Sequence, residues 1–301
     1  MRLRKVFENP YCIFSVLANR GCFSWIPDKM FVKLLFRSQM GKWPNLKDPK
    51  TFSEKLQWIK LYDRNPEYTK MVDKYAVKDY VAGKIGSEYV IPTLGVWDRV
   101  EDIDFDTLPD QFVLKCTHDC GGIVICRDKT QLDIAAAKQQ LQKCLKKDYY
   151  ALNREWPYKN VKPRIIAEQF LEDPVYKELR DYKFFCFNGE VKAIVVGTER
   201  KRENEKVRLD FFDAEYNHFD MCLLGYHCAD VAPEKPRCYE QMKVLASQLA
   251  QGIPEVRVDF YEVDGNIYFG ELTFFSAGGI IPFDPECWDE IFGQWLQLPN
   301  K

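Results

Sequence analysis

The sequence predicts an α+β fold in which antiparallel hairpins are combined with amphipathic helices. Asn188-Gly189 and Asp264-Gly265 each divide two strand-like apolar runs, which is typical of the tight turns of β-hairpins. Strands joined by such short turns run antiparallel. Between and around these hairpins the sequence has the patterns of helices. Helices are expected over residues 29–40, 134–145 and 240–251.

Length and composition indicate a cytoplasmic protein with a real core. A chain of 301 residues is long enough for about two domains. Its 43 Lys and Arg residues balance 45 Asp and Glu residues, so no overall charge bias favours nucleic acid as a partner. The 11 cysteines are odd in number and irregularly spaced, which indicates reduced thiols rather than a disulfide framework. We expect no signal peptide and no membrane span, because no apolar run is long enough.

The beginning of the chain is basic. Residues 1–60 contain twelve Lys or Arg and four Asp or Glu, a difference of eight positive charges. The helix expected over residues 29–40 lies within this segment and stops at Gly41. A basic amphipathic segment could rest on the inner face of a membrane or on an acidic polymer. The alternative is a helix docked on the core with its lysines in solvent.

The hairpin expected over residues 256–273 is the first candidate functional element. Asp259 lies near the end of its first strand and Glu271 on the partner strand, so the hairpin can place two carboxylates side by side. Such a pair repels unless it shares a proton or a cation, and Mg²⁺ is held by one or two carboxylates together with substrate phosphates. The alternative is a pair of solvated carboxylates.

Residues 112–125 form a second candidate. An apolar strand ends in Lys115, a polar turn contains Gly121-Gly122, and an apolar strand returns. A lysine in this position is well placed to meet phosphate oxygens, and glycines let backbone N–H groups approach them closely. A plain hairpin whose glycines only form the turn is the alternative. Further along, Glu168 is embedded in the apolar run 163–171 and needs a partner, either a lysine or an adenine amino group.

A group of cysteines in the same turn raises the possibility of zinc. Cys116, Cys120 and Cys126 lie close together in the sequence with His118 among them. No CxxC pair accompanies them, and a structural zinc site normally needs four ligands. Buried thiols without a metal are therefore the favoured interpretation.

The order of these elements resembles the ATP-grasp superfamily and, within it, the TupA-like branch associated with teichuronopeptide biosynthesis. The likeness rests on the order and spacing of four short segments, residues 49–58, 72–75, 182–189 and 269–274. It implies an ATP-grasp fold, with two α+β lobes and ATP between them. The implied parts are a basic helical N-terminal region (1–70), a small lobe with a phosphate loop (71–164) and a large lobe with a metal-binding hairpin (165–301).

The resemblance also implies roles for particular residues. The nucleotide residues are two phosphate-binding lysines, a glutamate near the adenine amino group, a segment that contacts the base and an acid at the ribose. These are Lys74, Lys115, Glu168, Phe170, Leu171 and Asp181. Arg257 would face the transferred phosphate, and Arg257 and Lys115 are the implied catalytic residues. Asp259 and Glu271 are the implied Mg²⁺ ligands, with Thr273 as a weaker ligand where relatives usually have Asn.

The acceptor side of the site is less well marked. His118 and the Gly278-Gly279 turn could line the entrance for the second substrate. The phosphate loop departs from the family pattern, because His118 is followed by Asp119 where relatives usually continue with small residues. A carboxylate near phosphates would be repulsive.

Together these residues predict an ATP-dependent carboxylate–amine ligase that forms an amide through an acyl phosphate. The resemblance implies that it joins an amino acid or amine to a uronic acid or acidic chain of a bacterial surface polysaccharide, such as a capsule or teichuronopeptide. One alternative is a kinase with the same ATP site and a sugar hydroxyl as acceptor. A glycosyltransferase is another, although Asp102-Ile103-Asp104, its nearest metal motif, lacks a sugar-nucleotide context. The paired lysines and carboxylates disfavour a non-catalytic binding protein.

Overall fold

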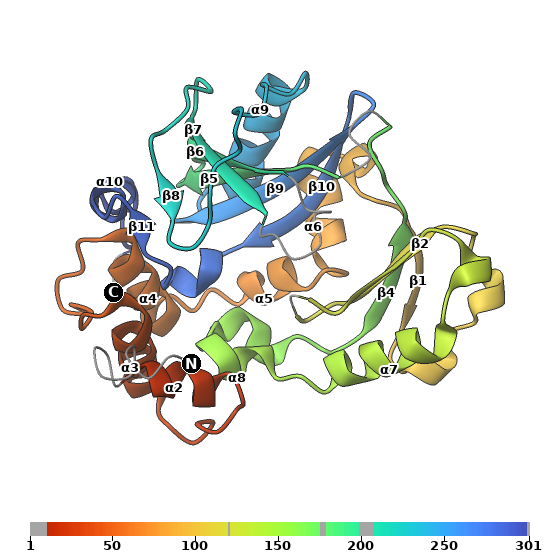
Figure 1. The fold of residues 1–301 in the computed structure, drawn as a ribbon, viewed down its shortest axis with the longest axis horizontal. Coiled ribbons are helices and arrows are strands. Elements are labelled where there is room, and N and C mark those ends of the chain that lie inside the picture. The colour runs from red at the N-terminus through yellow and green to blue at the C-terminus, as the bar shows by residue number, and fades with distance from the viewer. Residues whose placement is uncertain (1–10, 120, 175–178, 199–206, 300–301) are drawn as a thin grey trace.

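Two antiparallel sheets form the framework of the chain (Figure 1). The computed structural model describes residues 11–119, 121–174, 179–198 and 207–299. Within them, the larger sheet has the strand order β10-β9-β5-β6-β7 and the smaller sheet the order β1-β4-β2-β3. Each sheet is packed against helices, as expected for an α+β fold.

The larger sheet consists of two hairpins and an edge strand. Its strands are β5 (Asp181–Phe187), β6 (Glu190–Thr198), β7 (Arg208–Asp213), β9 (Val256–Val263) and β10 (Asn266–Thr273). The two turns are those expected from the sequence, and both have residues with positive φ at the Asn-Gly and Asp-Gly pairs. A two-stranded ribbon of β8 (Cys222–Leu223) and β11 (Phe283–Asp284) lies beside this sheet.

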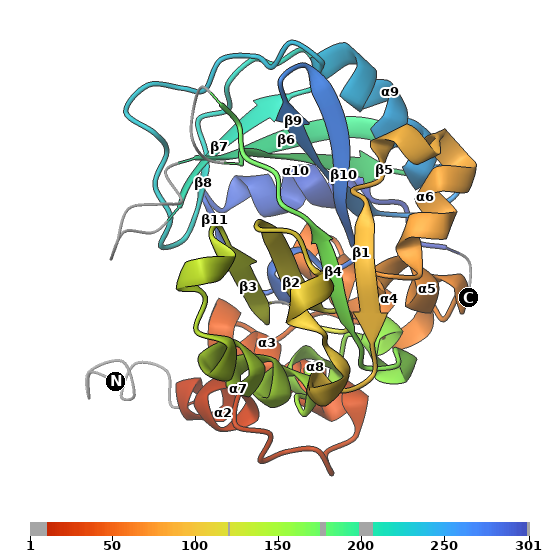
Figure 2. The ribbon, with the colours of Figure 1, turned by 90° about the vertical axis from the view of Figure 1, so that its right-hand side faces the viewer.

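Helices cover the two faces of the larger sheet differently (Figures 1 and 2). Helix α9 (Tyr239–Ala250) covers one face, where Phe184, Val258 and Phe260 are buried. On the opposite face, α4 (Phe52–Tyr62) and α10 (Cys287–Trp295) cover only one end, through aromatic contacts of Phe52 and Phe292 with the sheet. The same face also carries the charged side chains of Lys183, Arg257 and Asp259.

The smaller sheet has its own core. Its strands are β1 (Thr93–Trp97), β2 (Phe112–Cys116), β3 (Ile123–Cys126) and β4 (Ile165–Gln169). Helix α7 (Ile134–Leu145) packs against it through Leu141, which is fully buried with Leu114. The predicted boundary between the lobes, at residues 164 and 165, falls just before β4, whereas in the structure the chain changes sheets between β4 and β5.

The remaining helices lie outside the two sheets. They are α2 (Cys12–Ala18), α3 (Asp28–Met40), α5 (Glu67–Val72), α6 (Val77–Ile85) and α8 (Tyr149–Asn153). Among them, α2 and α3 have a small core of their own. Short 3₁₀ turns are η1 (Ser87–Tyr89), η2 (Val100–Asp102), η3 (Phe105–Thr107), η4 (Lys129–Gln131), η5 (Trp156–Asn160) and η6 (Ser276–Gly279). Local signals explain two helix ends. Thr51 and Glu54 form a capping box at the start of α4, and α3 stops at Gly41, whose φ is 71°.

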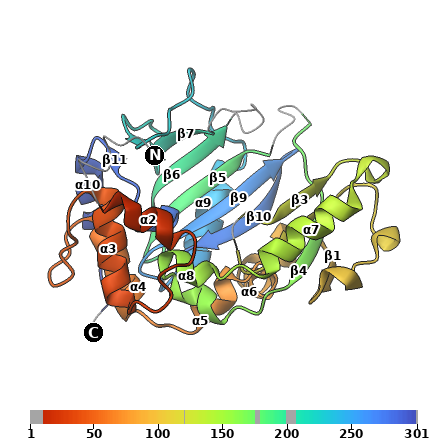
Figure 3. The ribbon, with the colours of Figure 1, turned by 60° about the horizontal axis from the view of Figure 1, so that its bottom comes forward.

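The N-terminal helices α2 and α3 lie at the opposite end of the molecule from β1 (Figure 3). Trp25, Met30 and Trp43 are exposed in this region, and Met30 and Trp43 lie close to Lys29 and Lys33. These residues would make the predicted contact with a membrane. That contact stays a prediction. Within the described ranges, none of the helices has the length and apolar character needed to cross a membrane.

Candidate active site

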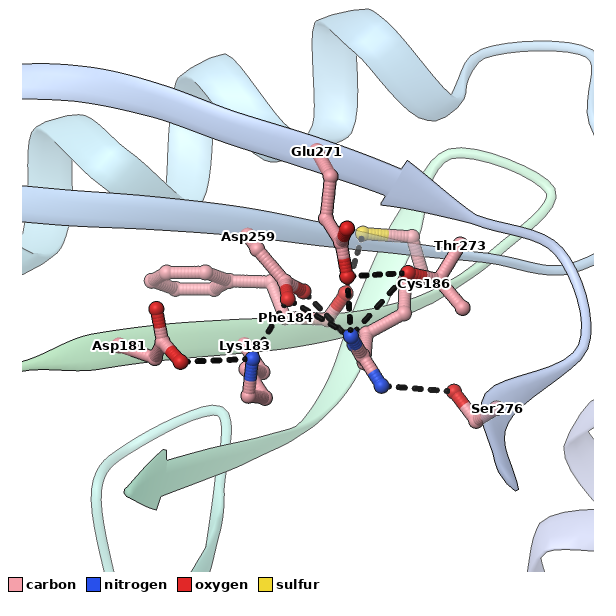
Figure 4. A network of polar contacts seen from close by, with 9 residues as sticks. Asp181, Lys183, Phe184, Cys186, Asp259, Glu271, Thr273 and Ser276 are labelled. Carbon is pink, nitrogen blue, oxygen red and sulfur yellow. Dashed lines mark hydrogen bonds and ion pairs between the residues drawn. The ribbon is translucent and has the colours of Figure 1, made fainter. Parts of the chain in front are cut away.

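Arg257 and Asp259 form the centre of a charged network on the face of the larger sheet opposite α9. Figure 4 shows Asp259 with its neighbours Lys183, Glu271 and Thr273. The guanidinium of Arg257 donates two hydrogen bonds to the Asp259 carboxylate, from Nε to Oδ1 and from Nη2 to Oδ2, each 2.7 Å long. Such a bidentate pair fixes both side chains in one plane. The same Nη2 also donates to Glu271 Oε1 at 3.0 Å and to Thr273 Oγ1 at 3.1 Å. The three predicted metal ligands therefore lie around one arginine.

A β-bulge places Glu271 in this network. Strand β10 pairs regularly with β9 up to Phe269, then skips Gly270, so that Glu271 lies opposite Asp259. A strict alternation would have put Glu271 on the same face as the buried Phe269. A Cβ on Gly270 would lie 3.1 Å from the carbonyl oxygen of Asp259, so the bulge favours glycine here.

Lys183 extends the network to the neighbouring strand β5. Its Nζ lies 2.7 Å from Asp259 Oδ2 and 3.0 Å from Asp181 Oδ2. Burial by itself raises the pKa of Asp259, but the adjacent Arg257 and Lys183 outweigh it and hold that pKa below its usual value. Asp259 is thus a buried carboxylate that stays ionised. Asp181 lies in this cluster, and its predicted contact with a ribose stays a prediction.

Oxygen donors converge here in a way that fits a hard cation. Asp259 and Glu271 supply carboxylates and Thr273 a hydroxyl, which is the donor chemistry that Mg²⁺ uses in proteins. The Glu271 side chain is 42% exposed, so it is open to solvent beside a buried partner. The Thr273 hydroxyl donates to Glu271 Oε1 at 3.0 Å, which orients that carboxylate. The donor chemistry therefore fits Mg²⁺. In this structure Arg257 and Lys183 contact both oxygens of Asp259, and the role of the three residues as metal ligands stays a prediction.

A cavity of about 290 Å³ lies between the two sheets and contains four of the predicted nucleotide residues. Lys115 and Glu168 line it from the smaller sheet, and Tyr261 of β9 lines it from the larger sheet. Phe170 and Leu171 line it from the segment that follows β4. Apolar side chains such as Ile91 and Ile125 make up much of the remaining wall. Such a wall with a few polar groups is typical of a small-molecule site.

Glu168 at the edge of this cavity is paired with two lysines. Its Oε1 lies 2.7 Å from Lys78 Nζ, and its Oε2 forms an ion pair with Lys115. Burial favours the neutral acid, yet Lys115 and Lys78 together lower the pKa of Glu168 below its usual value. The expectation that a lysine satisfies this buried glutamate fits the structure, but sequence reasoning missed Lys78. The only signal was its position one turn after Lys74 in the first turn of α6.

Lys74 lies apart from these residues, against the predicted phosphate loop. Its backbone N–H donates to Thr117 O at 3.1 Å, and its ammonium donates to the carbonyl oxygen of Asp119. Asp119 is buried beside Cys144, so its carboxylate is directed into the small lobe. The same loop contains Gly121 with φ of 120°, a conformation that favours glycine.

A comparison with protein families identifies the chain. The family described as TupA-like ATPgrasp matches residues 54–297, which is most of the chain. The chain belongs to the TupA-like ATP-grasp family. Both the family and the ATP-grasp, α+β fold expected from the sequence are thereby confirmed. Among curated proteins, none matches the chain.

Several solved structures are similar to this TupA-like protein, at low sequence identity. D-alanine–D-alanine ligase from Bacillus anthracis, complexed with ATP, is 16% identical, with a TM-score of 0.38 over 68% of this chain and 53% of that chain. ATP-grasp ligase PsnB with its minimal precursor, Mg and ADP is 12% identical, with a TM-score of 0.39 over 74% and 57%. N5-carboxyaminoimidazole synthase from Aspergillus clavatus is 14% identical, with a TM-score of 0.37 over 68% and 44%. The chain therefore spans about half the length of these proteins.

The acceptor residues predicted for this TupA-like protein are mostly buried. His118 is 4% exposed, and its Nε2 lies 3.2 Å from the carbonyl oxygen of Lys147. Burial lowers the pKa of His118, so the ring is neutral at pH 7. Gly278 and Gly279 are also buried, with φ of 66° and 65°. Their contact with a second substrate stays a prediction.

Nothing in the sequence indicated that Lys60 and Glu155 would be buried near each other beneath the Gly278-Gly279 turn. Lys60 of α4 donates to Gly278 O at 2.6 Å, and Gln57 donates to Gly279 O at 3.0 Å. Burial lowers the pKa of Lys60 to about 8 and raises that of the nearby Glu155 to about 7. Ser276 in the same turn accepts a hydrogen bond from Arg257 Nη1 at 3.4 Å. The turn thus connects α4 with the charged network.

The cysteine cluster considered for zinc does not assemble in the described part of the structure. Cys116 lies 3.8 Å from the carbonyl oxygen of Leu141, whereas Cys126 faces the carbonyl oxygen of Asp110 at 3.5 Å. Burial raises the pKa of Cys116 to about 12, so its thiol is neutral. Cys120 lies outside the described residues.

Proposed function

We propose that the protein is an ATP-dependent carboxylate–amine ligase, which forms an amide through an acyl phosphate. The observation that carries the proposal is the arrangement of Arg257 between Asp259, Glu271 and Thr273, on the sheet face that borders the lysine-lined cavity. Membership of the TupA-like ATP-grasp family supports the same reaction class.

ATP is proposed to bind in the cavity between the lobes. The base would lie against Phe170 and Leu171, with Glu168 near its amino group and Lys115 at the phosphates. Lys74 would reach the phosphates from the side of the loop, and Asp181 would hold the ribose. In the structure Glu168 pairs with both Lys115 and Lys78, and Lys115 is the one of these two lysines that lines the cavity.

Asp259, Glu271 and Thr273 would hold Mg²⁺. When bound, the ion would neutralise charge on the phosphate oxygens of ATP. The protein's own part is to keep Asp259 ionised and to orient both carboxylates. Arg257 and Lys183 do this by lowering the pKa of Asp259 against the effect of burial.

The proposed chemistry is phosphoryl transfer followed by capture. A substrate carboxylate oxygen attacks the γ-phosphorus of ATP, the bond to the bridging oxygen breaks, and ADP leaves. The amine then attacks the acyl carbon, phosphate leaves, and the amine loses a proton to give the amide. Arg257 and Lys115 stabilise the negative charge on the transferred phosphoryl group, because catalysis of this step is mainly positioning and electrostatic stabilisation.

The proposed carboxylate is a uronic acid or an acidic chain of a bacterial surface polysaccharide, and the proposed amine is an amino acid or related compound. This class is supported by the resemblance to the TupA-like branch and by the basic residues of the first sixty positions. The lysines Lys29 and Lys33 on α3 are among those that would attract such an anionic acceptor.

The test is ADP release with combinations of uronic acids and amines, with products identified by mass spectrometry. Asp259→Ala and Glu271→Ala should each abolish ADP release, whereas Glu190→Ala, which removes an exposed carboxylate on β6, should leave it unchanged. Undiminished ADP release in both active-site variants would refute the assignment. ADP with a stable phosphoester and no dependence on amine would identify a kinase, and release of a nucleoside diphosphate from a nucleotide sugar would identify a glycosyltransferase.

A further inference from the structure

The loop after β7 brings four metal-binding side chains together, away from the charged network of β9 and β10. Asp210 lies in the middle of β7, and His218, Cys222 and Cys228 lie on the loop that follows. The loop returns to β7 on both sides of Asp210. Phe219 N donates to Phe211 O at 2.8 Å, and Leu209 N donates to His227 O at 3.0 Å. The fold thus closes this loop over one buried carboxylate.

The donor atoms of three of these residues are close to one another, and the fourth residue, Cys222, contacts one of the three. One donor atom each of Asp210, His218 and Cys228 lies within 4.8 Å of the other two. Asp210 Oδ1 and His218 Nε2 are 3.1 Å apart, and the sulfurs of Cys222 and Cys228 are 3.2 Å apart. The sulfur separation is well beyond a disulfide bond of about 2.05 Å. The two cysteines are therefore adjacent thiols, and Cys222 reaches the group of three through its contact with Cys228.

The distances agree with tetrahedral coordination of one ion. Nitrogen and oxygen ligands about 2.0–2.1 Å from a tetrahedral zinc lie about 3.3 Å from each other, and two sulfur ligands about 2.3 Å from it lie about 3.8 Å apart. The Asp210–His218 separation of 3.1 Å is about 0.2 Å short of its value, and the sulfur separation of 3.2 Å is about 0.6 Å short, so the two sulfurs would move apart on binding the ion. Thiolate and imidazole ligands together favour zinc over magnesium or calcium.

The burial of Asp210 is a second, independent observation. Its side chain is only 1% exposed, and its other oxygen, Oδ2, accepts a hydrogen bond from Ala229 N at 3.1 Å. A buried carboxylate is costly unless it is paired with positive charge. His218, with a side chain 37% exposed, leaves a route from solvent to the cluster.

We propose that Asp210, His218, Cys222 and Cys228 bind one Zn²⁺ ion in a structural site. Four protein ligands close the coordination shell, so the ion has no open position for catalysis. Its role is to hold the loop against β7, the edge strand of the larger sheet, and thereby protect that edge. Because β8 in this loop also pairs with β11, the ion stabilises the part of the chain that follows the η6 turn.

The test uses the full chain, expressed with zinc and purified without chelator under reducing conditions. Elemental analysis should find about one zinc per chain. Removal of the metal with a chelator should lower the melting temperature, and added zinc should restore it. Cys228→Ser and His218→Ala should each weaken zinc binding at least about tenfold in competition with a chromogenic chelator. Cys287→Ser, at an exposed cysteine of α10, and His227→Ala, at the neighbouring histidine, should bind zinc normally.

A variant can lose zinc binding simply because it does not fold, so a second measurement uses the unmodified chain. Cobalt added to the metal-free protein should give the visible bands of a tetrahedral site and a thiolate charge-transfer band. The proposal is wrong if the reduced chain takes up no zinc, or if cobalt shows no thiolate band. It is equally wrong if mass spectrometry finds Cys222 and Cys228 joined in a disulfide in protein that holds no metal. None of these outcomes bears on the ligase assignment, because ADP release is measured separately.

Discussion

Glu168→Gln is expected to destabilise the small lobe strongly. The carboxylate is buried between Lys78, 2.7 Å away, and Lys115, and the side chains of these lysines are only 11% and 17% exposed. Glutamine keeps the shape but removes the charge, so two ammonium groups lose their counter-ion. Removing one partner of a buried ion pair costs about 3–5 kcal/mol. Burial already lowers the pKa of Lys78. In the variant this lysine can therefore lose part of its positive charge, which keeps the loss of stability within this range.

The corresponding change in melting temperature follows from the size of the protein. Unfolding entropy is about 2.1 cal/mol/K per residue, or about 0.6 kcal/mol/K for this chain. A loss of about 3–5 kcal/mol therefore lowers the melting temperature by roughly 5–8 °C. Circular dichroism at pH 7 without nucleotide measures this shift.

Glu172→Gln is the matched control, because it lies four residues away and removes a carboxylate that pairs with Arg127 nearer the surface. A pair of that kind contributes about 0–1 kcal/mol, so the control should melt within about 2 °C of the unmodified protein. The reasoning would be refuted if Glu168→Gln melted as close to the unmodified protein as the control does. It would also be refuted if high salt removed the difference, since buried pairs are screened only weakly.

Two further predictions concern the residues around the η6 turn. Gly279→Ala should lower the free energy of unfolding by about 2–4 kcal/mol in urea titrations, because its Cβ would lie 2.9 Å from Leu56 Cβ and its φ is positive. Gly252→Ala, with φ of 79° and no atom within 4 Å of the new Cβ, should cost only about 1 kcal/mol, and equal losses would contradict the packing argument. Glu155 has its pKa raised from 4.5 to about 7, so its protonated form stabilises the fold at low pH and this contribution is lost as pH rises through 7. The free energy of unfolding of Glu155→Gln, measured relative to that of the unmodified protein, should therefore rise by up to about 3 kcal/mol between pH 4.5 and pH 8. A difference in stability that does not change with pH would be evidence against the raised pKa of Glu155.

The charged network could be predicted in part because strand alternation is a local property. Arg257 and Asp259 are two residues apart, so they share a face of β9 wherever that strand lies. Glu271 could be placed on the partner strand, but its position opposite Asp259 depends on the bulge at Gly270. A shift in the apolar pattern between Phe269 and Leu272 is the trace of that bulge in the sequence.

Partners that come from distant segments could not be predicted. In the sequence Lys78 and Lys60 look like any other helix lysine. Lys78 meets Glu168 because α6 packs beside β4, and Lys60 meets Gly278 because α4 packs beneath the η6 turn. The same is true of Asp210, which looks like an ordinary strand carboxylate. The partner and the burial of each of these groups depend on the packing of segments that are distant in the sequence.

The sequence by itself determined the local elements of this protein. The Asn-Gly and Asp-Gly turns and the stop at Gly41 depend on backbone preferences that act over a few residues. The tertiary structure alone decided that β4 joins the smaller sheet and that the loop after β7 closes over Asp210. These outcomes depend on which distant surfaces bury each other, and that choice is made by the packing of the whole chain rather than by any short stretch of it.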